Sequence, residues 1–172
     1  SVIKHRGPDA SAVFADNNLG LGHVRLSILD ISEVANQPMY SSSGRFIIVF
    51  NGEIYNFKEL AKILISDFGI HLKTSGDTEV LINLIDCLGI KKALQLLEGM
   101  FAFAAYDLKD KKLYLARDRF GEKPLFWYSK NNKIYFILLK YICYFYFNPT
   151  QSTLTNVKLI FNVSTNKCSD LC

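Results

Sequence analysis

Short runs of mostly apolar residues, bounded by polar turn-forming segments, recur along the chain, a pattern that predicts β-strands. These stretches share short polar segments at their ends, and they are residues 11–15, 19–28, 45–50, 100–108, 112–116, 125–129 and 134–138. The triplets Asp16-Asn17-Asn18 and Lys109-Asp110-Lys111, together with residues 41–44, have the composition of tight turns. We therefore expect neighbouring strands to form antiparallel hairpins.

The middle of the chain changes to the 3.6-residue period of amphipathic helices. The first predicted helix begins at Asn56, which has capping-box spacing to Glu59, and it ends at Gly69. The second is capped by Asp77 and ends at Gly89, and a short helical stretch follows it. Because strands come before and after these helices, the predicted fold class is α+β, with helices packed on antiparallel sheets.

The two ends of the chain differ from the middle. Residues 134–147 are almost wholly apolar or aromatic and are interrupted only by Lys140. A membrane-spanning helix needs about 20 such residues, so a buried pair of strands is favoured over a membrane-facing segment. Residues 148–172 show no helical or strand period and predict a poorly packed tail. The chain starts at Ser1 without an initiator methionine, an apolar signal core or a basic leader, so a fragment of a longer protein is expected.

Composition narrows the class of protein. With 172 residues, 49% of them hydrophobic and 21% charged, the chain suits one soluble domain with a real core. Its 20 basic and 16 acidic residues are interleaved, which argues against nucleic acid as a partner. Because the apolar segment is short, membrane binding is the less favoured alternative. The four cysteines form no CxxC pair, which argues against a zinc ribbon or a disulfide scaffold and favours a reducing, cytoplasmic location. The three histidines are scattered, and no metal site is expected from them.

The chemistry suggested by the residues lies at predicted strand ends. No GxGxxG, GxxxxGK[ST], HExxH or GxSxG motif occurs. Arg25 interrupts an apolar strand, Asn51-Gly52 follows another, and Asp77 heads a helix. Singly, these features also fit a structural ion pair, a turn and a helix cap. Together they match a free amino acid: a guanidinium for its carboxylate, a carboxylate for its ammonium, and an amide with a backbone N–H for an oxyanion.

Seven sequence blocks carry a family resemblance. They are HRGPD (5–9), GHVRLSILDIS (22–32), NQPM (36–39), FNGEIYN (50–56), SGDTEV (75–80), GMFAFAAYD (99–107) and LARDRFGEKPLF (115–126). In this order they resemble the glutaminase domain of glutamine-hydrolysing asparagine synthetases, which belongs to the class II glutamine amidotransferases. The resemblance covers residues 4–136 and implies a four-layer αββα sandwich of the N-terminal nucleophile type that lacks its first strand. Accordingly, we expect a domain over 1–136 and a divergent tail over 137–172.

The resemblance also implies roles for individual residues. Arg25 would hold the α-carboxylate of glutamine within a binding stretch made of Arg25, Leu26, Ser27, Ile28 and Leu29. Asn51 would supply a side-chain amide, and Gly52 a backbone N–H, to the oxyanion hole. Glu53 would complete this binding stretch, and Asp77 would receive the α-ammonium group. Arg6-Gly7-Pro8-Asp9 resembles the family's loop beside the nucleophile. Residues 117–119 are expected to form an ion-paired structural corner near the site.

Two departures from the family pattern limit what this chain is expected to do. The family nucleophile is an N-terminal cysteine upstream of the HRGPD block, and neither Ser1, which is too close to His5, nor Cys87, which has a core position, replaces it. From Ile137 onward the sequence no longer matches, and the synthetase domain that uses ATP and Mg is absent. We therefore expect the chain to need no cofactor and to be inactive alone, whereas its longer parent would hydrolyse glutamine with the synthetase domain as partner.

Three alternatives remain at this point. The first is a non-catalytic module, derived from the same domain, that binds glutamine or a protein partner. The second is another class II amidotransferase, which the GHVRLSILD and FNGEIYNFKEL blocks favour less. The third concerns the oligomeric state, because the sequence does not decide between a monomer and a homodimer.

Overall fold

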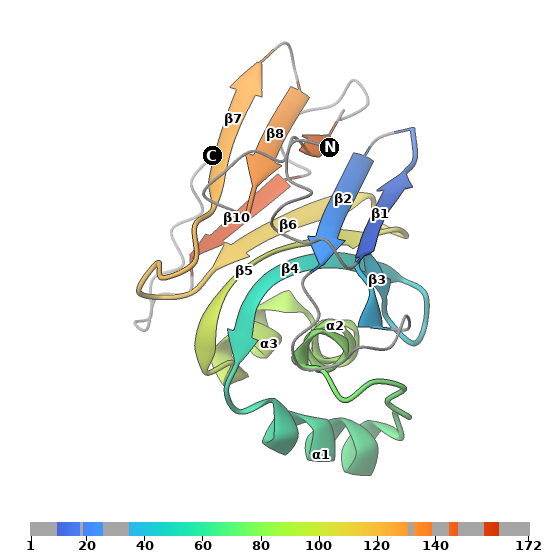
Figure 1. The fold of residues 1–172 in the computed structure, drawn as a ribbon. Helices are drawn as coiled ribbons and strands as arrows, with labels where there is room; N and C mark the ends of the chain where they lie inside the picture. Colours follow the sequence, from blue (N-terminus) through green and yellow to red (C-terminus); the bar gives the residue numbers. More distant parts are fainter. Residues whose placement is uncertain are drawn as a thin grey trace.

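Two β-sheets and three helices make up the part of the chain that the computed structural model describes, which is residues 10–17, 19–25, 35–130, 133–138, 145–147 and 157–161. Sheet A contains, in spatial order, β1 (Ala10–Ala15), β2 (Leu19–Arg25), β9 (Phe145–Phe147), β8 (Lys133–Ile137) and β7 (Phe126–Lys130). Sheet B contains β10 (Val157–Phe161), β6 (Lys112–Arg117), β5 (Gly99–Asp107), β4 (Phe46–Ile54) and β3 (Met39–Tyr40). The helices α1 (Phe57–Phe68), α2 (Asp77–Leu88) and α3 (Ile90–Leu96) cover one face of sheet B (Figure 1).

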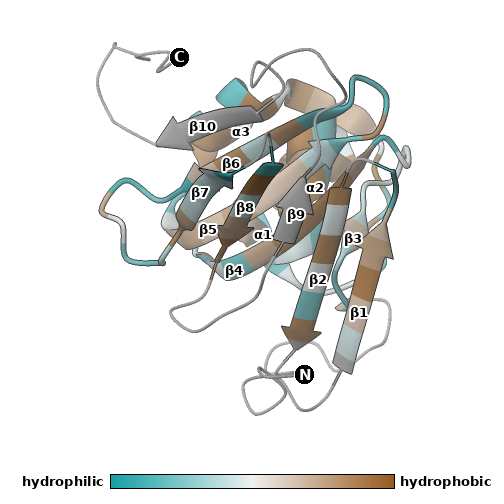
Figure 2. Cartoon of the chain, turned by 90° about the horizontal axis from the view of Figure 1, so that it is seen from above, coloured by the Kyte–Doolittle hydropathy of each residue, from teal (hydrophilic) through white to brown (hydrophobic). Residues whose placement is uncertain are grey.

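Strand β4 lies between two hydrophobic cores because its side chains alternate between its two faces. Ile48 and Phe50 pack on the helical side with residues such as Leu64, whereas Ile47 and Val49 pack between the sheets. All of these side chains are buried. In Figure 2 the central strands carry mostly hydrophobic colours, whereas the loop that connects β6 to β7 is mostly hydrophilic. The predicted α+β class is confirmed, and the described residues supply the two sheets and one helical layer of the expected αββα sandwich.

The hairpin turns form where the sequence predicts them. At the first, the Leu19 N–H donates to the Asp16 side chain (2.7 Å) and the Asp16 N–H donates to the Leu19 carbonyl (2.9 Å). At the β5–β6 turn, the Asp107 carboxylate accepts from the N–H groups of Lys109 (2.9 Å) and Asp110 (3.0 Å). Side-chain acceptors of this kind fix a turn through local bonds, which explains why local sequence predicts these turns.

For α1 and α2, the predicted C-terminal ends are correct, whereas the predicted N-terminal caps are wrong. Gly69 adopts a left-handed conformation (φ 64°) after α1, and the Gly89 N–H donates to Ile85 O after α2. Asn56 precedes α1 without a side-chain capping bond. Its side-chain amide donates to Leu96 O (2.8 Å), and its side-chain oxygen accepts from the Glu98 N–H (3.1 Å). A distant partner thus replaces the predicted capping box.

A strand also forms in the predicted tail. Val157–Phe161 forms β10, which pairs in parallel with β6, so the expectation of no strand after Phe147 is wrong. The partner strand lies about 40 residues earlier in the chain, and periodicity alone could not reveal a pairing over that separation. Within 134–147, the expected pair of strands is β8 and β9, which pair with each other antiparallel. No helix in the described ranges has the length and apolar character needed to cross a bilayer.

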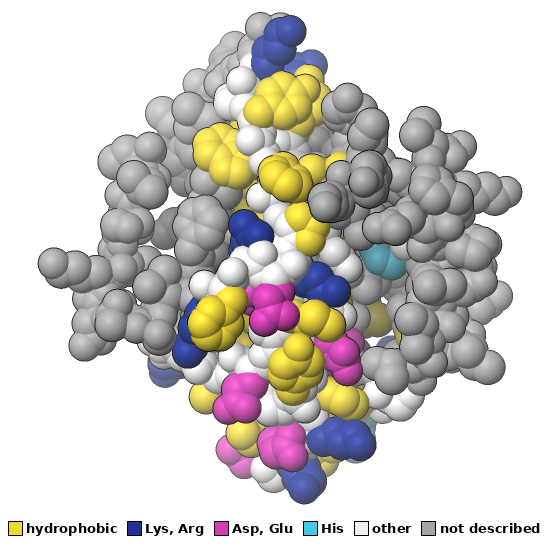
Figure 3. Space-filling model, turned by 60° about the vertical axis from the view of Figure 1, so that its left-hand side comes forward, with side chains coloured by type: hydrophobic (Ala, Val, Ile, Leu, Met, Phe, Trp, Pro, Cys, Tyr) yellow, Lys and Arg dark blue, Asp and Glu magenta, His cyan; other side chains and the backbone are white. Residues whose placement is uncertain are grey.

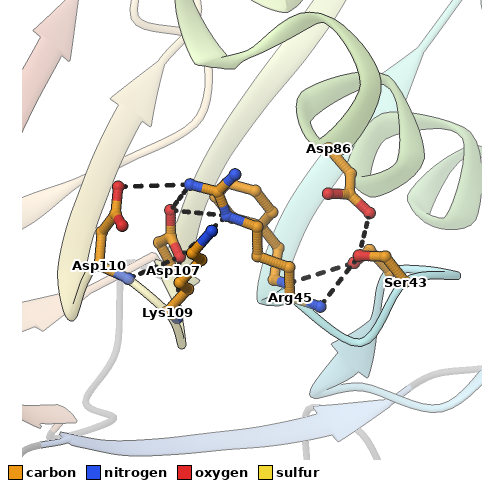
Figure 4. A network of polar contacts seen from close by, with 8 residues as sticks. Ser43, Arg45, Asp86, Asp107, Lys109 and Asp110 are labelled. Atoms are coloured by element: carbon orange, nitrogen blue, oxygen red, sulfur yellow. Dashed lines mark hydrogen bonds and ion pairs between the residues drawn. The ribbon is translucent and has the colours of Figure 1, made fainter.

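An ionic network fixes the end of the β4–β5 pair that is remote from Asn51 (Figure 4). The guanidinium of Arg45 donates through Nη2 to Asp107 Oδ2 (2.6 Å) and through Nε to Asp107 Oδ1 (3.2 Å), and a third bond reaches Asp110 (3.3 Å). Burial alone would raise the pKa of the Asp107 carboxyl, but the bonds from Arg45 and from two backbone N–H groups outweigh burial and lower it. This network therefore stabilises the folded chain only while Asp107 is ionised.

We expect Asp107→Asn to lower the free energy of unfolding at pH 7 by about 2 kcal/mol, because it removes a charged acceptor from three donors. Since the folded-state pKa of Asp107 lies below its unfolded value, the contribution is present above the unfolded pKa and is lost as the pH falls through the folded one. Urea unfolding of both proteins over a pH series measures the difference. Asp67→Asn, on the exposed face of α1, is the matched control, and a difference that stayed constant into strong acid would contradict the assignment.

Candidate active site

Asn51 lies near the end of β4, on the face of that strand that looks toward sheet A. The alternation that sends Ile47 and Val49 between the sheets also places Asn51 on that side. Its amide nitrogen donates to the carbonyl of Leu138, the residue that follows β8 (2.5 Å). A carboxamide nitrogen carries two hydrogens, so this bond orients the group and leaves a second donor.

The stretch FNGEIYN does not turn where the sequence predicts. Asn51, Gly52, Glu53 and Ile54 all continue β4 and pair antiparallel with β5 in unbroken register. The prediction that Asn51-Gly52 follows the strand as a turn is therefore wrong. The strand continues because its partner residues 99–102, far along the chain, extend the ladder by four more pairs.

At Gly52 the backbones of β4 and β5 approach each other closely. Its φ of +156° is rarely adopted by residues with a side chain, and a Cβ there would lie 2.6 Å from the Phe101 Cα and closer still to the Met100 carbonyl. Gly99, also at φ +156°, has the reciprocal environment, since a Cβ on it would meet the Glu53 carbonyl. Only glycine fits at either position, so the backbone of Gly52 is held rigidly by its neighbour strand.

The ladder register orients the Gly52 N–H away from β5. Tyr55 and Glu98 face each other in register, and the Tyr55 N–H donates to Glu98 O (2.7 Å). Hydrogen-bonded pairs alternate along an antiparallel ladder, so the N–H groups of Phe50, Gly52 and Ile54 point to the opposite edge of β4. Beyond the two-residue strand β3, no described strand pairs with this edge.

Two side chains accept the N–H groups on either side of Gly52. The Phe50 N–H donates to Gln37 Oε1 (2.6 Å), and the Ile54 N–H donates to Asp77 Oδ2 (2.9 Å). The Gly52 N–H lies between them, and none of the described residues provides an acceptor for it. It is therefore a backbone donor in position to bind a group from outside the described structure.

Gln37 is a site residue that was not predicted from the sequence. It is nearly buried, and its amide nitrogen also contacts the Thr78 hydroxyl at the start of α2 (3.4 Å). It thus connects the edge of β4 to the helix that carries Asp77. Its place in the NQPM block is the only signal that the sequence offers, because its partners lie 13 and 41 residues away.

Asp77 is a buried carboxylate in the first turn of α2. It is 7% exposed, and the N-cap position belongs to Gly76, so the prediction that Asp77 caps the helix is wrong. Burial raises the pKa of Asp77, and nearby Glu53 adds to the rise, against the lowering effect of backbone N–H groups that include that of Ile54. None of the described Lys and Arg side chains forms an ion pair with it. A buried carboxylate without a cation favours binding of a cationic group.

Glu79 holds the loop that leads to Asp77. Its buried carboxylate accepts from the N–H groups of Lys73 (3.0 Å) and Thr74 (2.7 Å) and from the Thr74 hydroxyl (2.8 Å). These bonds close residues 73–76 onto the first turn of α2. Asp77 is consequently fixed on both sides, by the loop before it and by β4.

The remaining predicted residues are placed only in part. Arg25 ends β2 and pairs with Ala10, and its side chain lies outside the described part of the structure. Leu26, Ser27, Ile28 and Leu29, like the loop 6–9 and Ser1, fall outside the described residues. Glu53 lies on β4 with an exposed side chain, on the same side of the strand as Asn51. The structure thus brings together Asn51, Gly52, Glu53 and Asp77.

Among the described residues, the 117–119 corner forms without the predicted ion pairs. Asp118 accepts from the backbone N–H groups of Phe101 (3.2 Å), Phe120 (3.1 Å), Glu122 (2.9 Å) and Lys123 (3.0 Å). Burial would raise the pKa of Asp118, but these bonds outweigh burial and lower it. Arg117 donates to the carbonyls of Lys123 and Gly121. Backbone N–H and carbonyl groups are therefore the partners of Asp118 and Arg117, for which the sequence suggested ion pairs.

Comparison with known proteins identifies relatives. A family model described as "Glutamine amidotransferase domain" matches residues 1–139. The chain is 42% identical over 135 residues to asparagine synthetase [glutamine-hydrolyzing] 1 of Bacillus subtilis, covering 78% of this chain and 21% of that protein. It is 40% identical over 153 residues to putative asparagine synthetase [glutamine-hydrolyzing] 2 of Methanocaldococcus jannaschii, covering 78% and 29%. It therefore spans less than a third of the length of these relatives.

A solved structure shows the same fold. Glutamine phosphoribosylpyrophosphate amidotransferase from B. subtilis, in complex with ADP and GMP, superimposes with a TM-score of 0.55 at 25% identity, over 74% of this chain and 27% of that one. The match supports an N-terminal nucleophile fold for the sandwich described above. With the family model covering most of the sequence, this chain belongs to the glutamine amidotransferase domain family.

Proposed function

We propose that this chain is the glutaminase unit of an asparagine synthetase, which binds L-glutamine and releases its amide nitrogen as ammonia. One observation carries the proposal. Asp77 is a buried carboxylate that pairs with no cation among the described residues, and it bonds to the N–H of Ile54, two residues along β4 from the Gly52 N–H, for which the described residues provide no acceptor. A cation-binding group beside an oxyanion donor matches the two ends of one glutamine molecule.

Asp77 binds the α-ammonium group of glutamine. Binding of a cation offsets the burial of this carboxylate, which otherwise raises its pKa. Arg25, the last residue of β2, is the proposed partner of the α-carboxylate, as the family resemblance implies. These two contacts act on substrate and transition state alike, so they determine affinity more than turnover.

Asn51 and Gly52 stabilise the tetrahedral intermediate. Attack on the amide carbonyl places negative charge on its oxygen, and the second hydrogen of the Asn51 amide and the Gly52 N–H are the donors for that charge. The Leu138 carbonyl fixes the first donor and the contact with Phe101 fixes the second. Donors held in place in this way lower the barrier without reorganising during the reaction.

Cys87 does not supply the nucleophile. It lies half-buried on α2 and packs against the helical side of the core. Burial and the neighbouring Asp86 raise the pKa of its thiol, so the reactive thiolate is disfavoured. The proposed nucleophile is the N-terminal cysteine implied by the family resemblance, and turnover is therefore best measured in a form of the protein that carries one.

The acceptor of ammonia is proposed from the relatives, whose names state asparagine synthetase. ATP and Mg²⁺ are assigned to the synthetase part that activates aspartate, and glutamine hydrolysis in this domain uses neither. The proposed location is the cytoplasm, where a thiol such as Cys87 remains reduced.

Binding of L-glutamine to the chain tests the role of Asp77 without any turnover. We expect Asp77→Asn to weaken binding at least tenfold, because a charge-assisted bond to the α-ammonium is lost. Because burial raises the pKa of Asp77, binding by the unmodified chain should begin to weaken, as the pH falls, at a higher pH than an ordinary aspartate would give. Isothermal titration calorimetry over a pH series measures both effects.

Two controls separate this contact from a general loss of structure. Glutaramate, which is glutamine without its α-amino group, should bind the unmodified chain and Asp77→Asn equally weakly. Asp67→Asn, on the exposed part of α1, should bind L-glutamine normally. If Asp77→Asn bound L-glutamine as well as the unmodified chain does, or if neither bound it, the proposed function would be wrong.

A further inference from the structure

The segment that contains β3 runs alongside α2 (Figure 1). Near the start of this segment, the amide nitrogen of Gln37 donates to the hydroxyl of Thr78 (3.4 Å). Farther along, the N–H of Ser42 donates to the side-chain oxygen of Asn83 (2.8 Å). Both bonds join residues 41 positions apart, so the segment and the helix run in the same direction. Gln37 therefore lies at the end of α2 that carries Asp77, and Ser42 lies farther from that end.

The side chain of Gln37 connects the strand and the helix that form the candidate site. Its Oε1 accepts the N–H of Phe50 on β4 (2.6 Å), and its Nε2 donates to Thr78, the residue after Asp77 (3.4 Å). Gln37 and Thr78 are each 9% exposed, so water is poorly placed to replace either bond. One carboxamide thus holds the start of α2 against β4.

Gly52 lies between two connections that hold the start of α2 to β4. On one side Asp77 itself accepts the N–H of Ile54 (2.9 Å), and on the other side Gln37 accepts that of Phe50 (2.6 Å). Strand β4 pairs with β5 over its whole length, so it is the rigid member of this contact. A single bond would let the start of α2 turn about that point, whereas two connections fix both its distance and its angle. The position of the Asp77 carboxylate relative to the Gly52 N–H therefore depends on Gln37.

Surface charge does not select an amino acid on the face that Figure 3 displays. Over the lower part of that face, the described Lys and Arg side chains are mixed with Asp and Glu side chains, so no single sign of charge gathers there. A free amino acid carries both charges, and exposed charges are screened by salt, whereas buried groups at defined positions are screened much less. Selection of a zwitterion therefore depends on the spacing of buried groups such as Asp77.

We propose that Gln37 is a positioning residue for glutamine hydrolysis, which sets the distance between the Asp77 carboxylate and the Gly52 N–H to the length of the substrate. It acts through Thr78 and Phe50 and not by contact with glutamine. The inference rests on the proposed function, because that function supplies the two anchors, the α-ammonium group at Asp77 and the amide oxygen at Gly52. A substrate held at both ends loses affinity and alignment when one anchor moves relative to the other.

Amide hydrogen exchange tests this connection in the 172-residue chain without any ligand. Gln37→Met keeps the length of the side chain and removes both hydrogen bonds. The N–H of Ile54 bonds to Asp77 and not to Gln37. If Gln37 holds Asp77 in place, exchange at Ile54 should become about tenfold faster relative to exchange at Val49, in the centre of β4. A general loss of stability would accelerate both amides alike, and NMR measures the two rates.

Two further variants locate the effect. Thr78→Val keeps the shape of the side chain and removes the hydroxyl that Gln37 contacts. It should accelerate exchange at Ile54 in the unmodified chain and add nothing in the Gln37→Met chain, because the two changes break the same connection. Asn83→Leu is the matched control, since it removes a buried amide that joins the same segment to α2 farther from Asp77. It should leave the ratio of the two rates unchanged.

Binding of L-glutamine measures the consequence for the site. Gln37→Met and Thr78→Val should each weaken binding of L-glutamine about fivefold, as loss of one hydrogen bond does. Both should bind glutaramate, which has no α-amino group, as the unmodified chain does. A role limited to folding would weaken both ligands alike. Asn83→Leu should bind L-glutamine normally, and isothermal titration calorimetry measures each affinity.

The inference is wrong if Gln37→Met leaves the ratio of exchange at Ile54 to exchange at Val49 unchanged. It is also wrong if L-glutamine and glutaramate are weakened equally, or if Asn83→Leu acts as Gln37→Met does. If Gln37→Met does not fold, Thr78→Val alone must show both effects. If the unmodified chain binds no L-glutamine, the proposed function and this role are both wrong. Normal binding through Asp77, without any effect of Gln37→Met, overturns this role alone.

Discussion

Gly52→Ala is expected to lower the free energy of unfolding by about 3–5 kcal/mol, the sum of an overpacked contact and backbone strain. The added methyl group would lie 2.6 Å from the Phe101 Cα and would press on the Met100 carbonyl. Both obstacles are backbone atoms of a central strand, so they cannot move aside as a flexible side chain could. β4 and β5 would have to separate at the position where the oxyanion donor is held.

Gly44→Ala is the matched control for Gly52→Ala. Gly44 also has a positive φ (+75°), but no heavy atom lies within 4 Å of the position that its Cβ would occupy. This variant isolates the cost of the backbone conformation, about 1 kcal/mol. Chemical unfolding of both variants gives the comparison, and equal losses of stability would show that the close approach of β4 and β5 is not the cause.

Asn51→Ala should reduce kcat for glutamine hydrolysis by about a hundredfold or more, with little change in KM, in a form of the protein that carries the N-terminal cysteine. The removed donor acts mainly once the carbonyl oxygen has become an oxyanion, so substrate binding loses little. Asp77→Asn should show the opposite division, with KM raised and kcat less affected. Steady-state release of ammonia from glutamine measures both.

Asn51→Asp tests whether the hydrogen-bond donor, and not the size of the side chain, causes this effect. Aspartate has the size of asparagine but cannot donate to either the Leu138 carbonyl or an oxyanion. It should be at least as inactive as Asn51→Ala. Where a synthetase part is attached, synthesis from supplied ammonia should persist in both variants, since that route bypasses Asn51. A rise in KM alone, with kcat unchanged, would contradict the oxyanion role.

Local sequence predicted the elements that depend on local interactions. The 3.6-residue periods and the glycines at 69 and 89 gave α1 and α2 within a residue or two, and the polar triplets gave the hairpin turns. In contrast, β10 and the last four residues of β4 depend on partner strands far along the chain. Periodicity carries no information on such pairings, which explains both errors.

The residues of the candidate site were selected by the family resemblance, and the sequence predicted their contacts only in part. The family resemblance selected Asn51, Gly52 and Asp77, which the structure places together at the end of β4. Isolated motifs suggested a turn and a helix cap for the same residues, because a local pattern cannot show that the Asp77 carboxylate bonds to Ile54 instead. Gln37 was missed for the same reason, since both of its partners are distant.

The outward N–H groups on the edge of β4 could pair with a strand of another molecule, and the acceptor side chains of Gln37 and Asp77 prevent this. A run of outward N–H groups is a template on which a strand of another molecule can add, and this is a common start of aggregation. Here Gln37 accepts the Phe50 N–H and Asp77 accepts that of Ile54, so within the described part of the chain the segment 50–54 leaves one outward donor for a foreign backbone, at Gly52. One donor cannot hold a strand in register, but it can bind a single oxygen atom. The same two acceptors thus leave the Gly52 N–H open to a ligand without making this edge of β4 a template for a strand of another molecule.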